Sequence, residues 1–203
     1  MIDVITLCDY IGTFAFAVSG IRLASAKNFD WFGAYVVGVV TAVGGGTLRD
    51  ILIGATPFWM IHISYLIISA LALLFIVIFR HEAAVIKNTF FLFDTIGLCL
   101  FTVVGIEKTL QYDFSIWVAI VMGMVTGAFG GMLRDILINE VPLIFRQDIY
   151  ASACVAGGLV YWGCESLSFS PFITYSLSAG TVFLLRMLAM KYHISLPILK
   201  GDE

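Results

Sequence analysis

A threonine, a run of glycines and an arginine–aspartate pair stand together at two places in the chain. The two segments contain Thr41, Gly44, Gly45, Gly46, Arg49 and Asp50, and Thr126, Gly130, Gly131, Arg134 and Asp135. Glycine costs about 1 kcal/mol of helix propensity relative to alanine, and a charge near mid-bilayer costs at least about 2.5–3.5 kcal/mol. Groups this costly usually face a bundle interior or a solute path, where carboxylates and freed carbonyls attract cations. The doubled segment therefore indicates a route for cations.

Two further aspartates, Asp9 and Asp94, stand early in the apolar segments that precede the glycine runs. We expect Arg49 to reach an aspartate on another helix, with Asp9 the nearest candidate, because its neighbour Asp50 is turned by about 100°. Two ionised aspartates and one arginine give each group a charge of −1, which attracts cations and repels anions. The alternative is that the arginine–aspartate pairs are bridges that only pin helices together.

Transmembrane helices are the elements that must carry these residues. Of 203 residues, 61% are hydrophobic and 12% are charged, whereas soluble domains have about 25% charged residues. The net charge of −3 and the lack of a basic tract exclude nucleic acid as a partner. A helix needs about 20 apolar residues to cross the hydrocarbon layer. We predict an all-α membrane protein with seven spans: Val4–Ala24, Trp31–Ile53, Phe58–Phe79, Thr89–Ile106, Ile116–Ile138, Ile149–Cys164 and Pro171–Met190.

The chain matches itself when it is shifted by 85 positions. Asp9 then falls on Asp94, and the two glycine segments coincide. Each unit holds three spans, an odd number, so the second copy must enter the membrane from the opposite side. Inverted repeats are typical of transport proteins, which place the solute route at the repeat interface. We predict one transmembrane domain, residues 1–203, with repeats at about 4–80 and 89–165 and a seventh helix at about 171–190.

Loop charges predict the orientation of the chain. The first, third and fifth connections and the C-terminal tail hold most of the basic residues: Arg22, Lys27, Arg80, Lys87, Arg146, Lys191 and Lys200, with Arg186 near the end of the last span. The other connections hold only Lys108. Short loops rich in lysine and arginine stay cytoplasmic. We therefore expect an inner-membrane protein with its N-terminus outside and its C-terminus in the cytoplasm.

Other chemistry has no support in the sequence. The histidines lie at span ends or in loops without carboxylate or cysteine companions: His62, His81 and His193. The cysteines lack paired spacing and are expected to be small buried hydrophobes: Cys8, Cys99, Cys154 and Cys164. No nucleophile–base pair, phosphate-binding loop or dinucleotide fingerprint is present. We expect no enzyme activity, no cofactor and no metal site.

The glycine runs allow two interpretations. A break or kink would turn carbonyl groups toward a wet cavity, where they can coordinate cations. A smooth groove would instead let two helices approach closely, as small residues commonly do in membranes. In the second copy Phe129 stands where the first has Gly44. We expect Phe129 to narrow the inner end as an apolar plug, because hydrophobic constrictions can gate by dewetting.

The doubled Thr–Gly–Arg–Asp segments, in two three-span units followed by a seventh span, resemble the prokaryotic trimeric intracellular cation (TRIC) channels. The resemblance covers nearly the whole chain. It implies a homotrimer in the lipid bilayer, with an hourglass pore in every subunit that passes potassium and sodium. In such a pore the Gly-rich kinks of the second and fifth spans form the narrow part. Bacterial relatives that share these motifs are also described as glycine transporters.

These observations favour a channel for monovalent cations, K⁺ and Na⁺. Its path would contain the aspartates, glycines, threonines and arginines above together with Phe129: Asp9, Thr41, Gly44, Gly45, Gly46, Arg49, Asp50, Asp94, Thr126, Phe129, Gly130, Gly131, Arg134 and Asp135. One alternative is a secondary carrier for glycine or a similar zwitterion, in which an arginine binds the carboxylate and an aspartate the ammonium group. Another is a membrane scaffold that transports nothing.

Overall fold

A computed structural model describes residues 4–79 and 89–197 of the chain. The longer helices are α1 (Val4–Ala26), α2 (Trp31–Leu52), α4 (Ser64–Ile78), α6 (Thr89–Leu110), α7 (Ile116–Leu137), α8 (Ala151–Ser166) and α9 (Pro171–Tyr192). Within the described ranges, five of them, α1, α2, α6, α7 and α9, are long and apolar enough to cross a membrane. The predicted class, an all-α membrane protein, is confirmed. The sequence features expected at Arg80, His81, Lys87 and Lys200 lie outside the described residues.

The predicted third and sixth spans differ from the structure at their starts. The third is divided into a short helix α3 (Phe58–Ile61) and α4, because His62 adopts an extended conformation. The sixth begins at Ala151, and the 3₁₀ turn η1 (Leu143–Phe145) precedes it. The short elements α3 and η1 start 85 residues apart, at Phe58 and Leu143, and the shortened helices α4 and α8 follow them.

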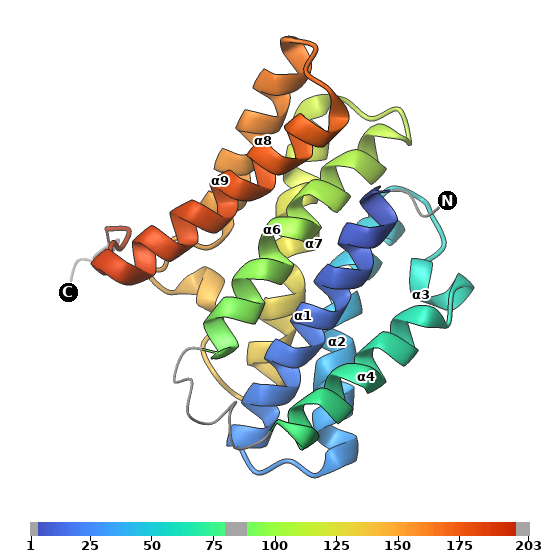
Figure 1. Cartoon of the computed structure of the whole chain (residues 1–203), viewed down its shortest axis with the longest axis vertical. Helices are drawn as coiled ribbons and strands as arrows, with labels where there is room; N and C mark the ends of the chain where they lie inside the picture. The colour runs from blue at the N-terminus through green and yellow to red at the C-terminus, as the bar shows by residue number, and fades with distance from the viewer. Residues whose placement is uncertain (1–3, 80–88, 198–203) are drawn as a thin grey trace, which may run out of the picture.

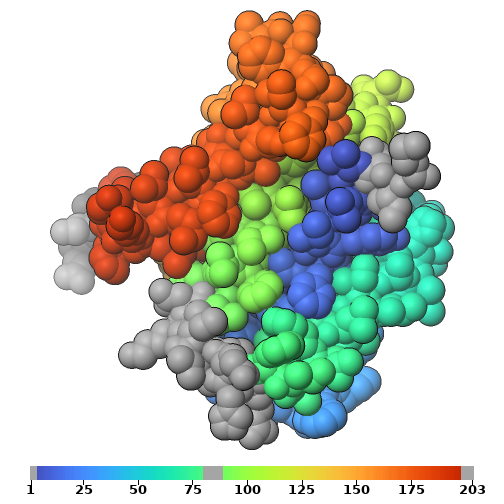
Figure 2. All heavy atoms as spheres, viewed as in Figure 1, coloured from blue at the N-terminus to red at the C-terminus, as the bar shows by residue number. Residues whose placement is uncertain are grey.

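The helices form a bundle around two central pairs. Helices α1 and α6 pack side by side, and α2 and α7 pack against each other behind them (Figure 1). Helix α4 covers α1 and α2, while α8 and α9 cover α6 and α7. In Figure 1, α1 runs downward and α6 runs upward, so the paired helices pass in opposite directions. The α8–α9 hairpin projects from the body at the top of the space-filling view (Figure 2).

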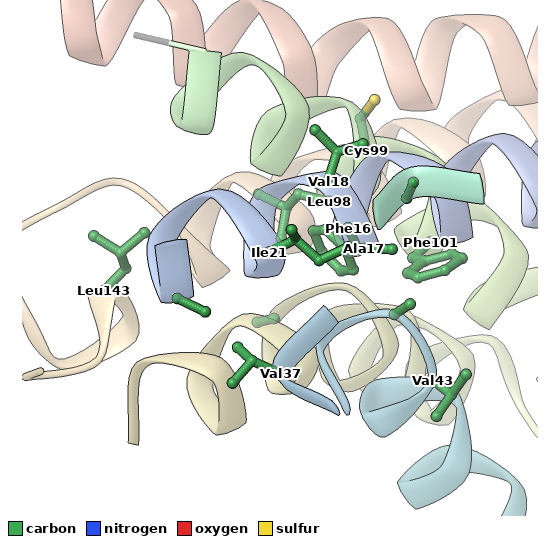
Figure 3. Close-up of a cluster of buried hydrophobic side chains, with 14 of the residues drawn as sticks. Phe16, Ala17, Val18, Ile21, Val37, Val43, Leu98, Cys99, Phe101 and Leu143 are labelled. Carbon is green, nitrogen blue, oxygen red and sulfur yellow. The ribbon is translucent and has the colours of Figure 1, made fainter. Parts of the chain in front are cut away.

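The contact between α1 and α6 is made by one phenylalanine and one glycine from each helix. The rings of Phe16 and Phe101 meet edge to face with their centroids 5.1 Å apart (Figure 3). A Cβ atom on Gly12 would lie 2.8 Å from Phe101, and one on Gly97 would collide with Phe16. The shift of 85 positions exchanges the two glycines and the two phenylalanines. The contact is therefore reciprocal, and each ring needs the missing side chain opposite it.

The glycine runs bring α2 and α7 together in the same reciprocal way. A Cβ atom on Gly45 would collide with the carbonyl oxygen of Thr126, and one on Gly130 with that of Thr41. Both helices continue through their glycines without interruption. Of the two interpretations of the glycine runs, the structure agrees with the groove for close helix approach, and neither described helix is interrupted. A bend within a continuous helix stays a prediction.

Gly45→Ala is expected to lower the melting temperature of the purified protein. The added methyl group has no room against Thr126, and overpacking of this kind costs about 1–3 kcal/mol. Gly180→Ala in α9 is the control, because nothing lies within 4 Å of a Cβ atom there. That change is expected to leave the melting temperature unchanged or raise it, since alanine gains up to about 1 kcal/mol of helix propensity. Equal melting temperatures in both variants would contradict the packing argument.

Candidate functional site

Two groups of charged residues lie at opposite ends of the α2–α7 contact. The first cluster consists of Asp9, Arg49, Asp50, Tyr65 and Lys108, and the second consists of Asp94, Arg134, Asp135, Tyr150 and Arg186. In each, an aspartate near the start of α1 or α6 lies beside the arginine–aspartate pair at the end of α2 or α7. The folded chain thus brings the repeated aspartate and the repeated arginine–aspartate pair together at both ends of the α2–α7 contact.

Asp50 is the centre of the first cluster. Its Oδ1 accepts from Arg49 Nε at 2.9 Å and lies 2.8 Å from Arg49 Nη2. Lys108 Nζ, from the end of α6, lies 3.0 Å from the same oxygen. The other oxygen, Oδ2, accepts the backbone N–H of Phe58 at 3.0 Å. The aspartate therefore binds two cationic groups and also holds the chain that turns back into α3.

Asp9 has a different partner from the one expected. Its carboxylate accepts a hydrogen bond from the Tyr65 hydroxyl at 2.6 Å, and among the described residues the ion pair of Arg49 is with Asp50. The expectation that Arg49 bridges to Asp9 is wrong here. The long arginine side chain lies back over Gly46 and against the Phe58 ring, where its planar guanidinium reaches Asp50.

In the second cluster the arginine does bridge two helices. Arg134 donates through Nε to Asp135 Oδ1 at 2.8 Å and through Nη1 to Asp94 of α6. Ser19 Oγ of α1 is a third partner, 2.8 Å from Nη1. Asp135 Oδ2 accepts the backbone N–H of Leu143 at 3.0 Å. This arginine therefore ties α1, α6 and α7 together, and Asp135 holds η1 as Asp50 holds α3.

Asp94 has two further polar neighbours in the second cluster. The Tyr150 hydroxyl donates to Asp94 Oδ1 at 3.4 Å. Arg186 of α9 places Nη2 3.8 Å from Asp94 Oδ2. The guanidinium of Arg186 also lies over the Tyr150 ring, 4.9 Å from its centroid. Tyr65 and Tyr150, which the shift of 85 pairs, thus bind the equivalent aspartates Asp9 and Asp94.

Lys108 and Arg186 change the charge expected for each cluster. Each cluster holds two aspartates and its own arginine, and one further basic residue brings the formal charge to zero in place of −1. Neither residue has a basic counterpart, because the shift pairs them with Leu23 and Phe101. The repeat comparison therefore missed both. The signal that would have found them is an isolated basic residue within or next to an apolar span.

The remaining candidate residues lie along the α2–α7 contact. The hydroxyls of Thr41 and Thr126 each donate to a carbonyl one turn earlier in their own helix, at 2.6 Å in both cases. Phe129 is half-buried, and the side chain that meets Gly44 is Leu133, 2.7 Å from the position of a Cβ atom. Leu133 therefore fills this contact, a position that the comparison of Gly44 with Phe129 did not reveal.

A cavity of about 170 Å³ leads from the surface to Asp135, between the ends of α1 and α7 and the start of α6. At its rim Lys27 Nζ lies 2.6 Å from Glu140 Oε1, and Arg146 Nη2 lies 3.5 Å from the other oxygen. The hydrogen bond and charge of Lys27 hold the pKa of Glu140 below its ordinary value. A carboxylate with a lowered pKa stabilises the folded protein at pH values above its unfolded-state pKa. This contribution is lost as the pH falls through its folded-state pKa. Salt screens this exposed pair.

Comparison with known proteins agrees with this geometry. The family described as glycine transporter matches the chain twice, over residues 6–81 and 91–166, which repeats the offset of 85. The UPF0126 inner membrane protein YadS of Escherichia coli K12 is 38% identical over 198 residues, 96% of both chains.

Two solved structures are also similar. One, described as a structural basis for conductance through TRIC cation channels, has a TM-score of 0.87 and 34% identity over 99% of this chain and all of the other. The TRIC orthologue of Rhodobacter sphaeroides has a TM-score of 0.89 and 33% identity over 94% of this chain and 99% of that one.

The long apolar helices and the fold shared with the solved TRIC structures define an integral membrane protein, and the similar protein YadS is named an inner membrane protein. The chain belongs to the TRIC family, whose sequence family is described as glycine transporter. Among the described residues, no group of three or more histidine, cysteine, aspartate or glutamate side chains is placed to hold a metal ion.

Asp135→Ala is expected to destabilise the protein strongly. It removes the acceptor of the Leu143 N–H and leaves Arg134 with one carboxylate fewer. Breaking a buried ion pair from one side costs about 3–5 kcal/mol. Glu140→Gln is the matched control, since it removes a carboxylate from a pair that is exposed, and its melting temperature is expected to stay near that of the wild type. A similar loss of melting temperature in both variants would show that Asp135 has no special structural role.

Proposed function

We propose that this chain is a monovalent-cation channel that conducts K⁺ and Na⁺ through a pore in each subunit of a homotrimer. The observation that carries the proposal is the similarity, over nearly the whole chain, to solved TRIC channels described as cation-conducting and trimeric. The chemistry of the clusters supports it, because carboxylates stand at both ends of the α2–α7 contact. Such a protein would need no cofactor and no enzymatic chemistry.

The proposed layout is one transmembrane domain, residues 1–203, with seven spans in two inverted repeats and a seventh helix. Repeat one would contain α1, α2 and α3–α4, and repeat two would contain α6, α7 and η1–α8, with α9 last. Three observations support it: the reciprocal glycine contacts, the double family match and the opposite directions of α1 and α6. The loop charges favour an N-terminus outside and a C-terminus in the cytoplasm.

The proposed path follows the α2–α7 contact from one cluster to the other. In the described conformation Gly45 touches Thr126 and Gly130 touches Thr41, which leaves no room between them for a hydrated ion. Conduction would therefore need α2 and α7 to bend or separate at the glycines. Carbonyl groups of Gly44–Gly46 and Gly130–Gly131 would then replace part of the water around the ion, and the aspartates would supply the attraction.

Asp94→Asn is expected to lower the cation-over-anion permeability ratio. The second cluster is formally neutral, so the change leaves it with a net positive charge from Arg134 and Arg186. The ratio is obtained from the reversal potential of single-channel currents in planar bilayers under a KCl gradient. A reversal potential equal to that of the wild type would remove Asp94 from the ion path.

Phe129→Ala is expected to raise the open probability of single channels. A smaller side chain beside the glycine contact lowers the apolar barrier that keeps a constriction dry. Phe172→Ala in α9 is the control, because Phe172 is exposed on the outer surface of the subunit. If both substitutions leave the open probability unchanged, Phe129 is not the constriction, and Leu133 becomes the residue to test.

The alternative function is a secondary carrier for glycine or a similar small zwitterion. The description of the matching family as glycine transporter favours it, and each cluster offers an arginine for a carboxylate and an aspartate for an ammonium group. Counterflow of labelled glycine in proteoliposomes that carry no measurable ion current would establish the carrier. Single-channel currents without glycine counterflow would establish the channel.

A further inference from the structure

Arg186 is a buried arginine in α9, a helix that follows the two matched segments, residues 6–81 and 91–166, and belongs to neither. Its side chain is 1% exposed. Helix α9 lies beside α8 and packs against α6 (Figure 1), and from there Arg186 Nη1 donates to the carbonyl oxygen of Ile149 at 2.9 Å. A buried arginine is costly unless a counter-charge is near. Among residues 4–79 and 89–197, the carboxylate within ion-pair distance of it is that of Asp94.

The Arg186–Asp94 pair is held loosely. Arg186 Nη2 and Asp94 Oδ2 are 3.8 Å apart, and neither atom has a hydrogen-bond partner among the described residues. Arg186 Nε is likewise without a partner there. The attraction between the two side chains is therefore electrostatic and depends directly on the spacing between α9 and α6. Asp94 is bound much more closely by Arg134, which belongs to the same repeat.

We propose that Arg186 is a positioning residue that sets the charge of the second cluster and thereby the cation preference of that end of the path. The inference rests on the proposed channel function. With Arg186 in place, two arginines balance Asp94 and Asp135; without it, the cluster has a charge of −1. A movement of α9 away from α6 would make the charge of the cluster more negative, as removal of Arg186 would. The unrepeated helix thus controls how strongly Asp94 attracts a cation.

Arg186→Gln tests the proposal in the full-length protein reconstituted in planar bilayers. The cation-over-anion permeability ratio, from reversal potentials in a KCl gradient, is expected to rise at least about threefold, because a buried charge is only weakly screened. Arg186→Lys keeps the charge and is expected to keep the wild-type ratio. Lys191→Gln removes the same charge from an exposed position of α9 and is also expected to keep it. An unchanged ratio in Arg186→Gln would overturn the proposal.

A charge-balanced pair of variants keeps the test decisive even where Arg186→Gln alone does not fold. Asp94→Asn leaves the cluster with one excess positive charge, and adding Arg186→Gln to it restores neutrality. The double variant is expected to recover the wild-type permeability ratio, whereas a ratio that stays at the Asp94→Asn value would refute the role of Arg186. Wild-type protein that passes no cation current would refute the channel itself. Conducting wild-type protein with no recovery in the double variant refutes this inference alone.

Discussion

The structure depends on neutralising the charge of carboxylates that are buried inside an apolar bundle. Asp50 and Asp135 are buried, and an isolated buried carboxylate costs several kcal/mol or more unless cations and N–H groups surround it. Each meets this demand in the same way, with one oxygen bound to the preceding arginine and the other to a backbone N–H eight residues later. The chain must therefore turn back directly after α2 and α7. The short elements α3 and η1, and the shortened helices that follow them, are consequences of this bond.

The glycines meet a second demand, which is contact between helices in an apolar solvent. Lipid tails are as apolar as leucine side chains, so helices in a membrane associate through close packing and hydrogen bonds. The reciprocal pairs Gly12–Phe101 and Gly97–Phe16 bring α1 and α6 together, and Gly45 and Gly130 do so for α2 and α7. The residues that lower helix propensity are thus the residues that join the two halves. The same absence of side chains leaves the backbone free to bend at the place where the proposed path is narrowest.

The sequence predicted the helices well because apolar runs and polar breaks are local signals. Helices α2 and α7 begin where predicted and end one residue earlier, and the repeat located both arginine–aspartate pairs. The division of the third span was not predictable, because the bond from Asp50 to the Phe58 backbone at the start of α3 and the extended conformation of His62 at its end arise only in the folded chain. The partner of Arg49 was missed because a long side chain chooses among groups that only the folded chain brings near it. By sequence Arg186 belongs with the basic residues near the end of the last span, and its burial against Asp94 depends on how α9 packs.

The two clusters share their aspartates and arginines, but the basic residues that neutralise them come from different places. Lys108 belongs to the second half of the chain, and its side chain is 25% exposed, whereas Arg186 comes from α9 and is 1% exposed. Water can solvate the lysine when it moves away from Asp50, and Arg49 then still pairs with the buried carboxylate. Water cannot replace Asp94 as the partner of the buried Arg186 in this way. Separating the two side chains requires α9 to move or water to enter the bundle. The two clusters thus share a repeated motif and the same formal charge. They differ in what would change that charge: movement of a partly exposed lysine side chain in the first, and movement of helix α9 in the second.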